Sequence, residues 1–529
     1  MSLIEEAIER LRAPQASAAI AELDAARVRF VAIDGPLEAR WQQAVRELAE
    51  CIHPLADSAP VLNEGGVYHG AWIESTGTIN SELLARFAPT AARDTHLLFA
   101  QHQRDDGMIP YKVTADGPGF SQIQIVTPLA RTVWNHYLLA GRDRAYLETM
   151  YRAMERYDDW LMEYRDTRGT GGVEAFCTFD TGHDLSPRFW QVADRGYLGD
   201  ARRYDPASPI LPFVAPDLTA NIACQRAYLA LIAEELGLPS SPWVAKSQAS
   251  LAALYEQCFD PADGVFYDRD VSGDLVRVQS DVLLRVLACE VGDASFFTAS
   301  LETYLLNSRK FFAHYGFTSL AMDDPRFDHD YTRNSWGGPS NFLSLIRAPH
   351  AFEHHGHVAE LGLSVLPVLS AVGQSETFPQ CLDPWTGAPG FTTVYSPSML
   401  WLLDTVERHF GILPRPDGTI WLSGLTPSRL DHGSAASAVA YSRLINGVLY
   451  ELAGDDTVMV GYRDGVEWLR FPRGWRVVLS ADGSVEAVVG LAATVVSGSI
   501  LGIALEVAPN ERVALDGSRT GPGFVAPRS

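Results

Sequence analysis

A long succession of helical hydrophobicity patterns constrains the fold of this 529-residue chain more than any other feature. Between residues 75 and 411, about ten to twelve segments carry apolar residues at positions i, i+3, i+4 and i+7, the spacing of one buried helix face. Some connections between them are short and charged, and others are long and rich in Gly, Pro, Asp and aromatic residues. Long irregular loops inside a compact domain usually serve function. The pattern predicts a toroid of helical hairpins with a site in its mouth.

The hydrophobic period changes after residue 411. Short runs such as VLYELA, TVMVGYR and WRVVLSA are typical of strands, and DG, GDD and PRG turns separate them. We therefore predict a mainly α fold class with three parts. These are an N-terminal helical segment at 1–64, a helical domain carrying the site at 65–411, and a C-terminal β-rich, β-sandwich-like domain at 412–529.

Charge and targeting signals restrict the partners. The formal net charge is −23 at pH 7, which argues against nucleic acid and anionic membranes because both require a basic surface. The sequence contains neither a run of about 18 apolar residues nor a signal peptide at its start, so we expect a cytoplasmic protein. Six scattered cysteines without metal-ligand spacing predict reduced core residues, and no metal or cofactor is required. A homo-oligomer is compatible with the sequence, which leaves the oligomeric state open.

The segment CTFDTGHDLSPRFW is the richest in chemistry. It places Asp180, His183, Asp184 and Arg188 among aromatic residues. Aromatic faces stack on sugar rings, and charged groups bind their hydroxyls. A carboxyl against aromatic groups can have a raised pKa, which a general acid needs near neutral pH. The alternative is a DxSP turn in which Asp184 caps the backbone and Arg188 neutralises it.

Three other regions supply candidate binding residues, each with a structural alternative. In TRNSWGGPSNF, Gly337 belongs to a tight turn between Trp336 and Asn341, although helix entry and packing explain the segment equally well. In ETFPQCLDPWTG, the acids Glu376 and Asp383 flank Gln380, and DPWTG is itself typical of a turn. The last region contributes four candidate pocket residues: Trp72, Glu74, Tyr111 and Gln122.

Other chemistries find little support. The sequence has no GxSxG nucleophile elbow, P-loop or GxGxxG after a strand. The densest histidine group lacks HExxH spacing, so we interpret it as helix surface or core. Its members are His350, His354, His355 and His357. The acidic loop MDDPRFDHD could hold calcium, but a solvated loop is the favoured interpretation.

Five segments occur in an order that resembles glycoside hydrolase family 63 and the mannosylglycerate/glucosylglycerate hydrolase-like group. They are DTGHDLSPRF, DPADGVFYDRD, FTSLAMDDPRF, YTRNSWGGPSNFL and FPQCLDPWTG, within roughly residues 65–410. The resemblance implies an (α/α)6 barrel and an inverting exo-type glycosidase acting on a small carbohydrate substrate. It also implies that Asp184 in DLSPR is the general acid, and that one sugar-binding motif falls on Tyr331, Arg333, Trp336 and Asn341.

The resemblance places the general base at Gln380, which departs from the glutamate of the family. An amide has no basic lone pair in the useful pH range, so Gln380 cannot deprotonate water. Another acid, such as Glu376, Asp383 or Glu353, could act instead, and this is our first choice. Alternatively, phosphate attacks without a base, as in an inverting phosphorylase or transferase, or the chain is a catalytically inactive carbohydrate-binding homologue. A sugar epimerase is disfavoured because the histidine group does not lie in a loop.

Overall fold

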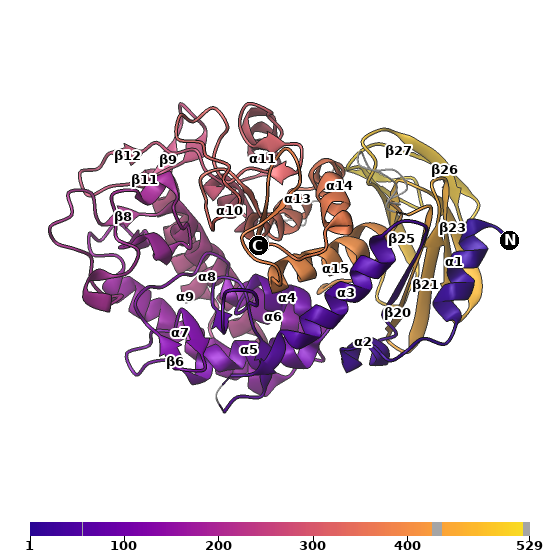
Figure 1. Cartoon of the computed structure of the whole chain (residues 1–529), viewed down its shortest axis with the longest axis horizontal. Coiled ribbons are helices and arrows are strands. Elements are labelled where there is room, and N and C mark those ends of the chain that lie inside the picture. The colour runs from indigo at the N-terminus through magenta and orange to yellow at the C-terminus, as the bar shows by residue number, and fades with distance from the viewer. Residues whose placement is uncertain (56, 426–435, 522–529) are drawn as a thin grey trace.

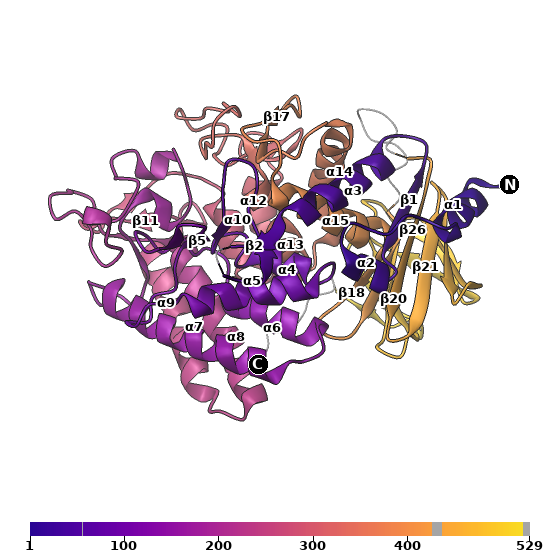
Figure 2. The same ribbon diagram turned by 60° about the horizontal axis from the view of Figure 1, so that its bottom comes forward.

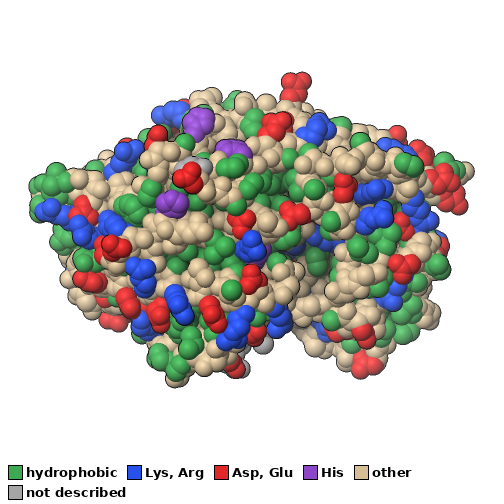
Figure 3. All heavy atoms as spheres, turned by 90° about the horizontal axis from the view of Figure 1, so that it is seen from below, with side chains coloured by type: hydrophobic (Ala, Val, Ile, Leu, Met, Phe, Trp, Pro, Cys, Tyr) green, Lys and Arg blue, Asp and Glu red, His purple; other side chains and the backbone are tan. Residues whose placement is uncertain are grey.

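The computed structural model describes residues 1–55, 57–425 and 436–521 of the chain. Most helices lie at the left and centre of Figure 1, and the strands of the C-terminal region lie at the right. The sequence prediction of a mainly helical chain followed by a β-rich region is confirmed at this level. Figure 3 shows one face, on which acidic and basic side chains are interspersed and a notch separates two lobes.

The helices fall into two groups along the chain. The N-terminal group comprises α1 (Leu3–Arg12), α2 (Ala21–Ala25) and α3 (Leu37–Glu50). The second group begins with α4 (Ile79–Leu84), α5 (Pro89–Gln101), α6 (Leu129–Leu139), α7 (Arg144–Tyr164), α8 (Pro216–Leu236) and α9 (Ser241–Cys258). It ends with α10 (Val282–Ala288), α11 (Ala294–Ser300), α12 (Phe342–Leu345), α13 (Ala348–His354), α14 (Val358–Gln374) and α15 (Ser396–Phe410). Short helical turns lie at Thr178–Asp180, Pro187–Phe189, Tyr197–Gly199 and Leu301–Leu305.

Short strands join the helices of the second group. They are β2 (Ile52–Pro54), β3 (Pro60–Leu62), β4 (Ala71–Trp72), β5 (Lys112–Thr114), β6 (Gly117–Gly119), β7 (Glu174–Ala175), β8 (Phe213–Val214), β9 (Phe259–Asp260) and β10 (Val265–Phe266). The remainder are β11 (Asp268–Arg269), β12 (Leu275–Val276), β13 (Phe312–Ala313), β14 (Gly316–Phe317), β15 (Ser340–Asn341), β16 (Cys381–Leu382) and β17 (Pro389–Gly390). The strand order β15-β16-β17 places residue 341 directly opposite residue 381, so the segments around them lie side by side.

Local sequence signals explain where the long helices begin and end. Asp143 caps α7, because its Oδ1 accepts hydrogen bonds from the backbone N–H groups of Ala145 (3.0 Å) and Tyr146 (3.2 Å). Helix α8 begins at Pro216 and ends before Gly237, whose φ of 75° is the left-handed conformation that terminates many helices. Most residues of α8 are buried on all sides, so this helix lies at the centre of its group.

The C-terminal region contains two main sheets. The first has the order β1-β20-β21-β22-β23, with β1 (Arg29–Ile33), β20 (Ala438–Ile445), β21 (Val448–Gly454), β22 (Val458–Arg463) and β23 (Val466–Pro472). The second has the order β18-β19-β24-β25-β28-β29. Its strands are β18 (Ile412–Pro414), β19 (Ile420–Ser423), β24 (Trp475–Leu479), β25 (Val485–Gly490), β28 (Arg512–Ala514) and β29 (Arg519–Thr520). A separate hairpin consists of β26 (Val496–Ile500) and β27 (Ile503–Val507).

The N-terminal segment packs against the C-terminal sheets. Strand β1 pairs antiparallel with β20, from Arg29 opposite Ser442 to Ile33 opposite Ala438. Figures 1 and 2 both show α1 beside β21 at the outer edge of the β region. The segment 1–64, predicted to be helical, also contains strands β1, β2 and β3.

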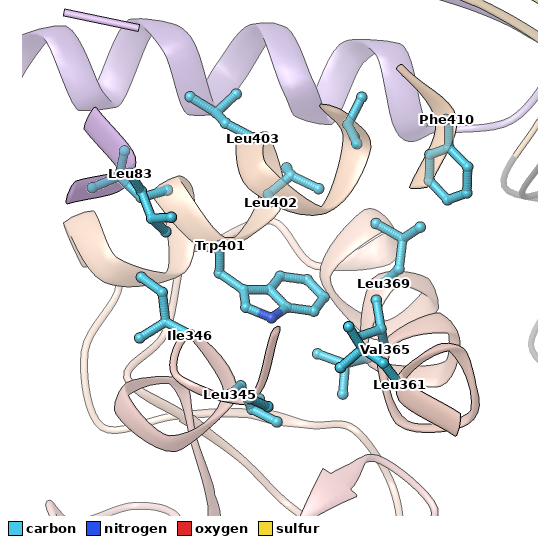
Figure 4. Packing of buried hydrophobic residues seen from close by; sticks show 14 of the residues in the cluster. Leu83, Leu345, Ile346, Leu361, Val365, Leu369, Trp401, Leu402, Leu403 and Phe410 are labelled. Carbon is cyan, nitrogen blue, oxygen red and sulfur yellow. The ribbon is translucent and has the colours of Figure 1, made fainter. Parts of the chain in front are cut away.

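One hydrophobic core continues from the helices into the sheets. Trp401 of α15 lies between Leu345, Leu361 and Val365, as Figure 4 shows. The same cluster includes Val477 of β24. Burial of this size stabilises a domain without disulfides, and the six cysteines, all in the described part of the chain, are buried and form no disulfide.

A turn at Asn307 follows the helical run that begins with α11. The run continues through the helical turn Leu301–Leu305 and stops there, and the Asn307 side chain accepts a hydrogen bond from the Arg309 N–H. Among the described residues, each helix is either too short or too polar to cross a lipid bilayer.

Candidate active site

A small cavity lies where several loops of the second helix group meet. Its volume is about 30 Å³, which is room for one or two water molecules. The lining residues come from within 64–75, 182–184 and 334–336, together with Gln124, Leu343, Gln380 and Tyr395. Loops separated by more than 300 residues in the sequence therefore share one cavity.

Asp184 reaches this cavity from the loop that follows the helical turn Thr178–Asp180. Its Oδ2 accepts a hydrogen bond of 2.5 Å from the Asn334 side chain. Burial first, and then the nearby carboxylates of Glu74 and Asp194, raise the pKa of Asp184 well above its ordinary value. This environment favours the protonated carboxyl group, the form that a general acid uses.

A directed chain of hydrogen bonds connects Asp184 to Gln380. The Tyr68 hydroxyl donates to Oε1 of Gln380 (2.9 Å), and Nε2 of Gln380 donates to Oδ1 of Asn334 (2.9 Å). The amide nitrogen of Asn334 then donates to Asp184. Each amide accepts at one end and donates at the other, so the chain has one consistent direction. A glutamate at position 380 would accept at both ends, so the Asn334 amide would have to turn and present its nitrogen to residue 380.

Glu64 presents a second carboxyl group to the cavity. It follows β3 and accepts hydrogen bonds from the Ser75 and Tyr395 hydroxyls. Burial raises the pKa of Glu64 to about 7, because the two hydroxyl hydrogen bonds offset only part of the lost hydration and the neighbouring Glu74 adds repulsion. A carboxyl group with this pKa exchanges protons near neutral pH.

Glu74 is the third carboxyl group of the cavity. Its Oε2 accepts a hydrogen bond of 2.8 Å from Gln124, and its Oε1 has no hydrogen-bond partner among the described residues. The guanidinium groups of Arg347 and Arg285 lie 3.8 and 4.0 Å from Oε1. Gly182, with a φ of 66°, passes so close that a Cβ atom there would overlap the Glu74 carboxylate. The loop bearing Asp184 therefore requires glycine at this point.

Two aromatic side chains form walls of the cavity. Trp336 is buried, and Arg285 lies over its ring at 4.7 Å from the centroid. Trp72 is partly exposed and packs edge-on against Tyr68, with ring centroids 5.5 Å apart. These rings supply the apolar faces on which a sugar can stack.

Two charged residues of the richest segment are instead paired inside the protein. Arg188 is buried and forms ion pairs with Asp217 (2.9 Å) and Asp268 (2.7 Å). Asp180 pairs with Arg165 at 2.6 Å and also accepts three backbone hydrogen bonds. Neither residue lines the cavity. The turn differs from the DxSP alternative, because the Ser186 hydroxyl, and not Asp184, accepts the hydrogen bond from the Arg188 N–H, and Arg188 neutralises Asp217 and Asp268.

The other predicted binding residues lie away from the described cavity. Tyr111 is buried in a hydrophobic cluster, and Gln122 donates to Gln124 (3.2 Å), which itself lines the cavity. Arg333 is exposed and pairs with Asp330 (2.6 Å). The remaining three residues make local structural contacts. The Asn341 side chain caps α12. The Gly337 carbonyl accepts a hydrogen bond from the Asp328 N–H, and the Tyr331 carbonyl accepts one from Cys381 Sγ.

The three acids suggested as substitutes for a base also lie outside the cavity lining. Glu376 is exposed, and Asp383 accepts hydrogen bonds from the N–H groups of the following turn and from His329 (3.0 Å). Glu353 pairs with Arg408 (2.5 Å). In the acidic loop MDDPRFDHD, Asp323, Asp324, Asp328 and Asp330 all have cationic partners.

Several residues that line the cavity were not predicted from the sequence as site residues. Glu64 and Tyr68 stand in the turn-rich stretch LNEGGVYHG, and Asn334 directly precedes the recognised Ser-Trp-Gly-Gly turn. The only signal was the position of these residues in or beside segments rich in glycine. Gln124 and Tyr395 carried no signal that we recognise.

A family model identifies the family of this chain. The family model described as "Mannosylglycerate hydrolase MGH1-like glycoside hydrolase domain" matches residues 68–398. This match confirms the resemblance stated from the sequence. No curated protein sequence matches the chain significantly.

Solved structures share the fold at low identity. The GH63 mannosylglycerate hydrolase from Thermus thermophilus, in complex with Tris and D-glycerate, is 19% identical with a TM-score of 0.57, over 70% of this chain and 99% of that one. A structure described as sialidase is 13% identical with a TM-score of 0.62, over 90% of this chain and 44% of that one. The GH78 family rhamnosidase of Bacillus sp. GL1 is 11% identical with a TM-score of 0.55, over 83% and 40%.

Proposed function

We propose that this chain, which belongs to the mannosylglycerate hydrolase MGH1-like glycoside hydrolases, is an inverting, exo-type glycosidase acting on a small glycoside at the cavity around Asp184. That it is a glycoside hydrolase follows from the family; the stereochemistry, the exo action and the residue roles are the proposal. One observation carries it, namely that Asp184, whose pKa is raised well above its ordinary value, and Glu64, whose pKa is about 7, line the same cavity.

In the proposed reaction Asp184 donates its proton to the leaving oxygen as the glycosidic bond breaks. A water molecule attacks the anomeric carbon from the opposite face, and the Glu64 carboxylate takes the proton that this water loses. Asp184 then regains a proton from solvent, and Glu64 releases its own. We assign the base to Glu64 because its pKa of about 7 suits proton transfer near neutral pH, whereas Gln380 has no proton-accepting role.

Glu74, Trp336 and Trp72 take binding roles in this proposal. Oε1 of Glu74 can accept a sugar hydroxyl, and the two indoles offer stacking faces. The cavity of about 30 Å³ holds the attacking water but not a pyranose, so side chains of the surrounding loops must move when the sugar binds. Tyr331, Arg333 and Asn341, which belong to the motif of the family, lie on those loops and are the first candidates for contacts with the rest of the substrate.

The proposal also concerns architecture. We place the catalytic machinery in residues 65–411 together with Glu64, the last residue of the N-terminal segment 1–64, and before the β-rich region 412–529, and infer that the second helix group forms an (α/α)6 toroid. Support comes from the contacts between successive helices, α4 with α5, α6 with α7 and α8 with α9. The meeting of the loops around residues 64, 184, 334 and 380 at one cavity is what the mouth of such a toroid requires.

Gln380 favours a second candidate. Because Gln380 is hydrogen-bonded at both ends, its position offers no carboxylate to a water molecule. A phosphorylase that uses phosphate as the nucleophile, or a carbohydrate-binding protein without turnover, would fit this amide equally well.

The test is incubation with disaccharides and with mannosyl- and glucosylglycerates, with and without phosphate, followed by NMR of the anomeric protons. We expect release of a sugar with inverted configuration that does not depend on phosphate. Asp184→Asn should lower turnover about 10²- to 10⁴-fold, and Glu64→Gln by a similar factor, whereas the exposed control Asp116→Asn should keep it. Retained configuration would refute the mechanism, and phosphate dependence would establish the phosphorylase.

Gln380→Glu separates the remaining possibilities. If Glu64 is the base, this substitution should not raise turnover, because the site already has the carboxylate that takes the proton of the attacking water. A large gain in turnover would show instead that the wild-type site lacks its base.

A further inference from the structure

A second, larger cavity lies away from the Asp184 site, between the helices and the β region. Its volume is about 260 Å³, compared with about 30 Å³ at the Asp184 site. Glu82 of α4, Tyr228 of α8, His350 and His354 of α13, and Trp421 of β19 all contribute to its walls, and so does Glu290. None of these residues has a role in the proposed hydrolysis.

Three potential metal ligands converge on one wall of this cavity. The donor atoms of Glu290, His350 and His354 all lie within 4.8 Å of one another. Nε2 of His350 lies 2.9 Å from Oε1 of Glu290, and Nδ1 of His354 lies 4.0 Å from Oε2. The two imidazole rings are one helical turn apart on α13, stacked with centroids 6.1 Å apart and an interplanar angle of 28°.

The histidine group of the sequence therefore divides into two pairs. His355 and His357 turn the other way and pack against Phe297, with ring centroids at 4.4 and 5.1 Å. His355 also directs both ring nitrogens at backbone carbonyl groups, those of Ala351 and Val291. Within this group, the pair at positions i and i+4 faces Glu290 and the cavity.

The backbone holds Glu290 in an unusual conformation. Its φ is 64°, in the left-handed region that glycine or asparagine normally occupies just after a helix, here after α10 and its cap Cys289. Such a conformation is costly for other residues, and it often marks a functional position. The Tyr228 hydroxyl donates to Oε1 of Glu290 (2.6 Å) and orients the carboxylate, as hydrogen-bond donors behind a metal site orient its ligands.

From this geometry we propose that Glu290, His350 and His354 bind one divalent transition-metal ion, with Zn²⁺ the best match. Two imidazoles and one carboxylate form a known three-ligand set for Zn²⁺, which leaves a fourth position open for water. That position faces the 260 Å³ cavity, through which the ion exchanges with solvent. The side chains of His350 and Glu290 are 25% and 20% exposed, so the ligands are reachable.

Charge and protonation support this assignment. Metal binding requires neutral imidazoles, and each of the two rings presents one nitrogen to the Glu290 carboxylate. Arg131, which lies nearby, opposes a cation, but its guanidinium is paired with Glu82 at 3.4 Å. The three arginines that line the cavity are likewise paired with acidic side chains, Arg86 with Asp404 and both Arg408 and Arg415 with Glu353.

The test is calorimetric titration of the chelator-treated full-length protein with ZnCl₂. We expect one ion per chain in the wild type. His350→Ala, His354→Ala and Glu290→Gln should each weaken binding at least about tenfold. His53→Ala is the matched control, because His53 is exposed and its side chain contacts the neighbouring Pro54 carbonyl; it should bind as the wild type does.

A second measurement keeps the test decisive if one variant folds poorly. Co²⁺ in place of Zn²⁺ should give the visible absorption of a tetrahedral site in the wild type and in His53→Ala, but not in Glu290→Gln, which keeps the shape of the side chain. The proposal is overturned if the wild type binds no Zn²⁺, or if it binds Zn²⁺ no better than the folded His350→Ala and Glu290→Gln variants. Absence of Zn²⁺ binding would not affect the hydrolase proposal, because none of the three proposed ligands lines the Asp184 cavity.

Discussion

Substitution of Gly182 by alanine tests whether the backbone beside Asp184 is shaped around Glu74. The structure predicts two separate penalties. The first is conformational, because Gly182 has a φ of 66°, which costs an alanine about 1–2 kcal/mol. The second is steric, because the new Cβ would overlap the Glu74 carboxylate. Overpacking of this kind typically costs about 1–3 kcal/mol.

Glu74 cannot relieve the overlap cheaply. Its side chain is buried, and Oε2 is held by the Gln124 amide at 2.8 Å. Turning the carboxylate away would break this hydrogen bond and move the group from Arg347 and Arg285. We therefore expect Gly182→Ala to lower the free energy of unfolding by about 2–5 kcal/mol in total.

Gly169 provides the matched control. It has the same φ of 66°, but a Cβ at this position would meet no atom within 4 Å. Gly169→Ala should therefore cost only the conformational part, about 1–2 kcal/mol. Urea denaturation of both variants, followed by far-UV circular dichroism, gives the difference, which we expect to be about 1–3 kcal/mol.

A double-mutant cycle with Glu74→Ala attributes this difference to one contact. Without the Glu74 carboxylate, Gly182→Ala should cost no more than Gly169→Ala, so the coupling energy should equal the steric part, about 1–3 kcal/mol. A coupling energy near zero, or equal costs for Gly182→Ala and Gly169→Ala, would refute the idea that Glu74 requires glycine at 182.

Three shorter predictions concern charged groups. The raised pKa of Glu64, about 7 against its ordinary 4.5, favours the folded state below pH 4.5, and this stabilisation is lost as the pH rises through 7. Wild type should therefore lose about 3 kcal/mol of its free energy of unfolding between pH 4 and 8 relative to Glu64→Gln, as measured by urea denaturation of both proteins. A difference between the two that stays constant with pH would contradict the raised pKa of Glu64. In the pH profile of kcat/KM, activity should fall below a pH near 7, where Glu64 becomes protonated. It should fall again at alkaline pH, where Asp184, whose pKa is raised well above its ordinary value, loses its proton. An acidic limb near pH 4 would exclude Glu64 as the base. Arg188→Met should destabilise the fold by about 3–5 kcal/mol in the same urea assay, because it leaves Asp217 and Asp268 buried without their partner, and a loss below about 1 kcal/mol would contradict this pairing.

The part of the fold that could be predicted from the sequence depends on local patterns. Helical periodicity located the long helices because each one buries a continuous face, as α7 does behind its Asp143 cap. The pairing of β1 with β20 was not predictable in this way. It joins residues 29–33 to 438–442, and nothing in either strand specifies a partner about 400 residues away. The same limit applies to the cavity, where Glu64 meets Gln380 and Asp184 only through the tertiary fold.

The charged residues of CTFDTGHDLSPRFW show why composition alone could not separate binding from structure. Asp180 and Asp184 are both aspartates near aromatic residues. Asp180, however, receives five hydrogen bonds, two from Arg165 and three from backbone N–H groups, which occupy its acceptor sites. The one side-chain hydrogen bond found for Asp184 comes from Asn334, within the described residues. A carboxyl group whose acceptor sites are filled by buried partners holds the fold, and one with spare capacity at a cavity is free to meet a ligand. Because the partners of Asp180 and Arg188 come from distant segments, this distinction becomes visible only when the chain is folded.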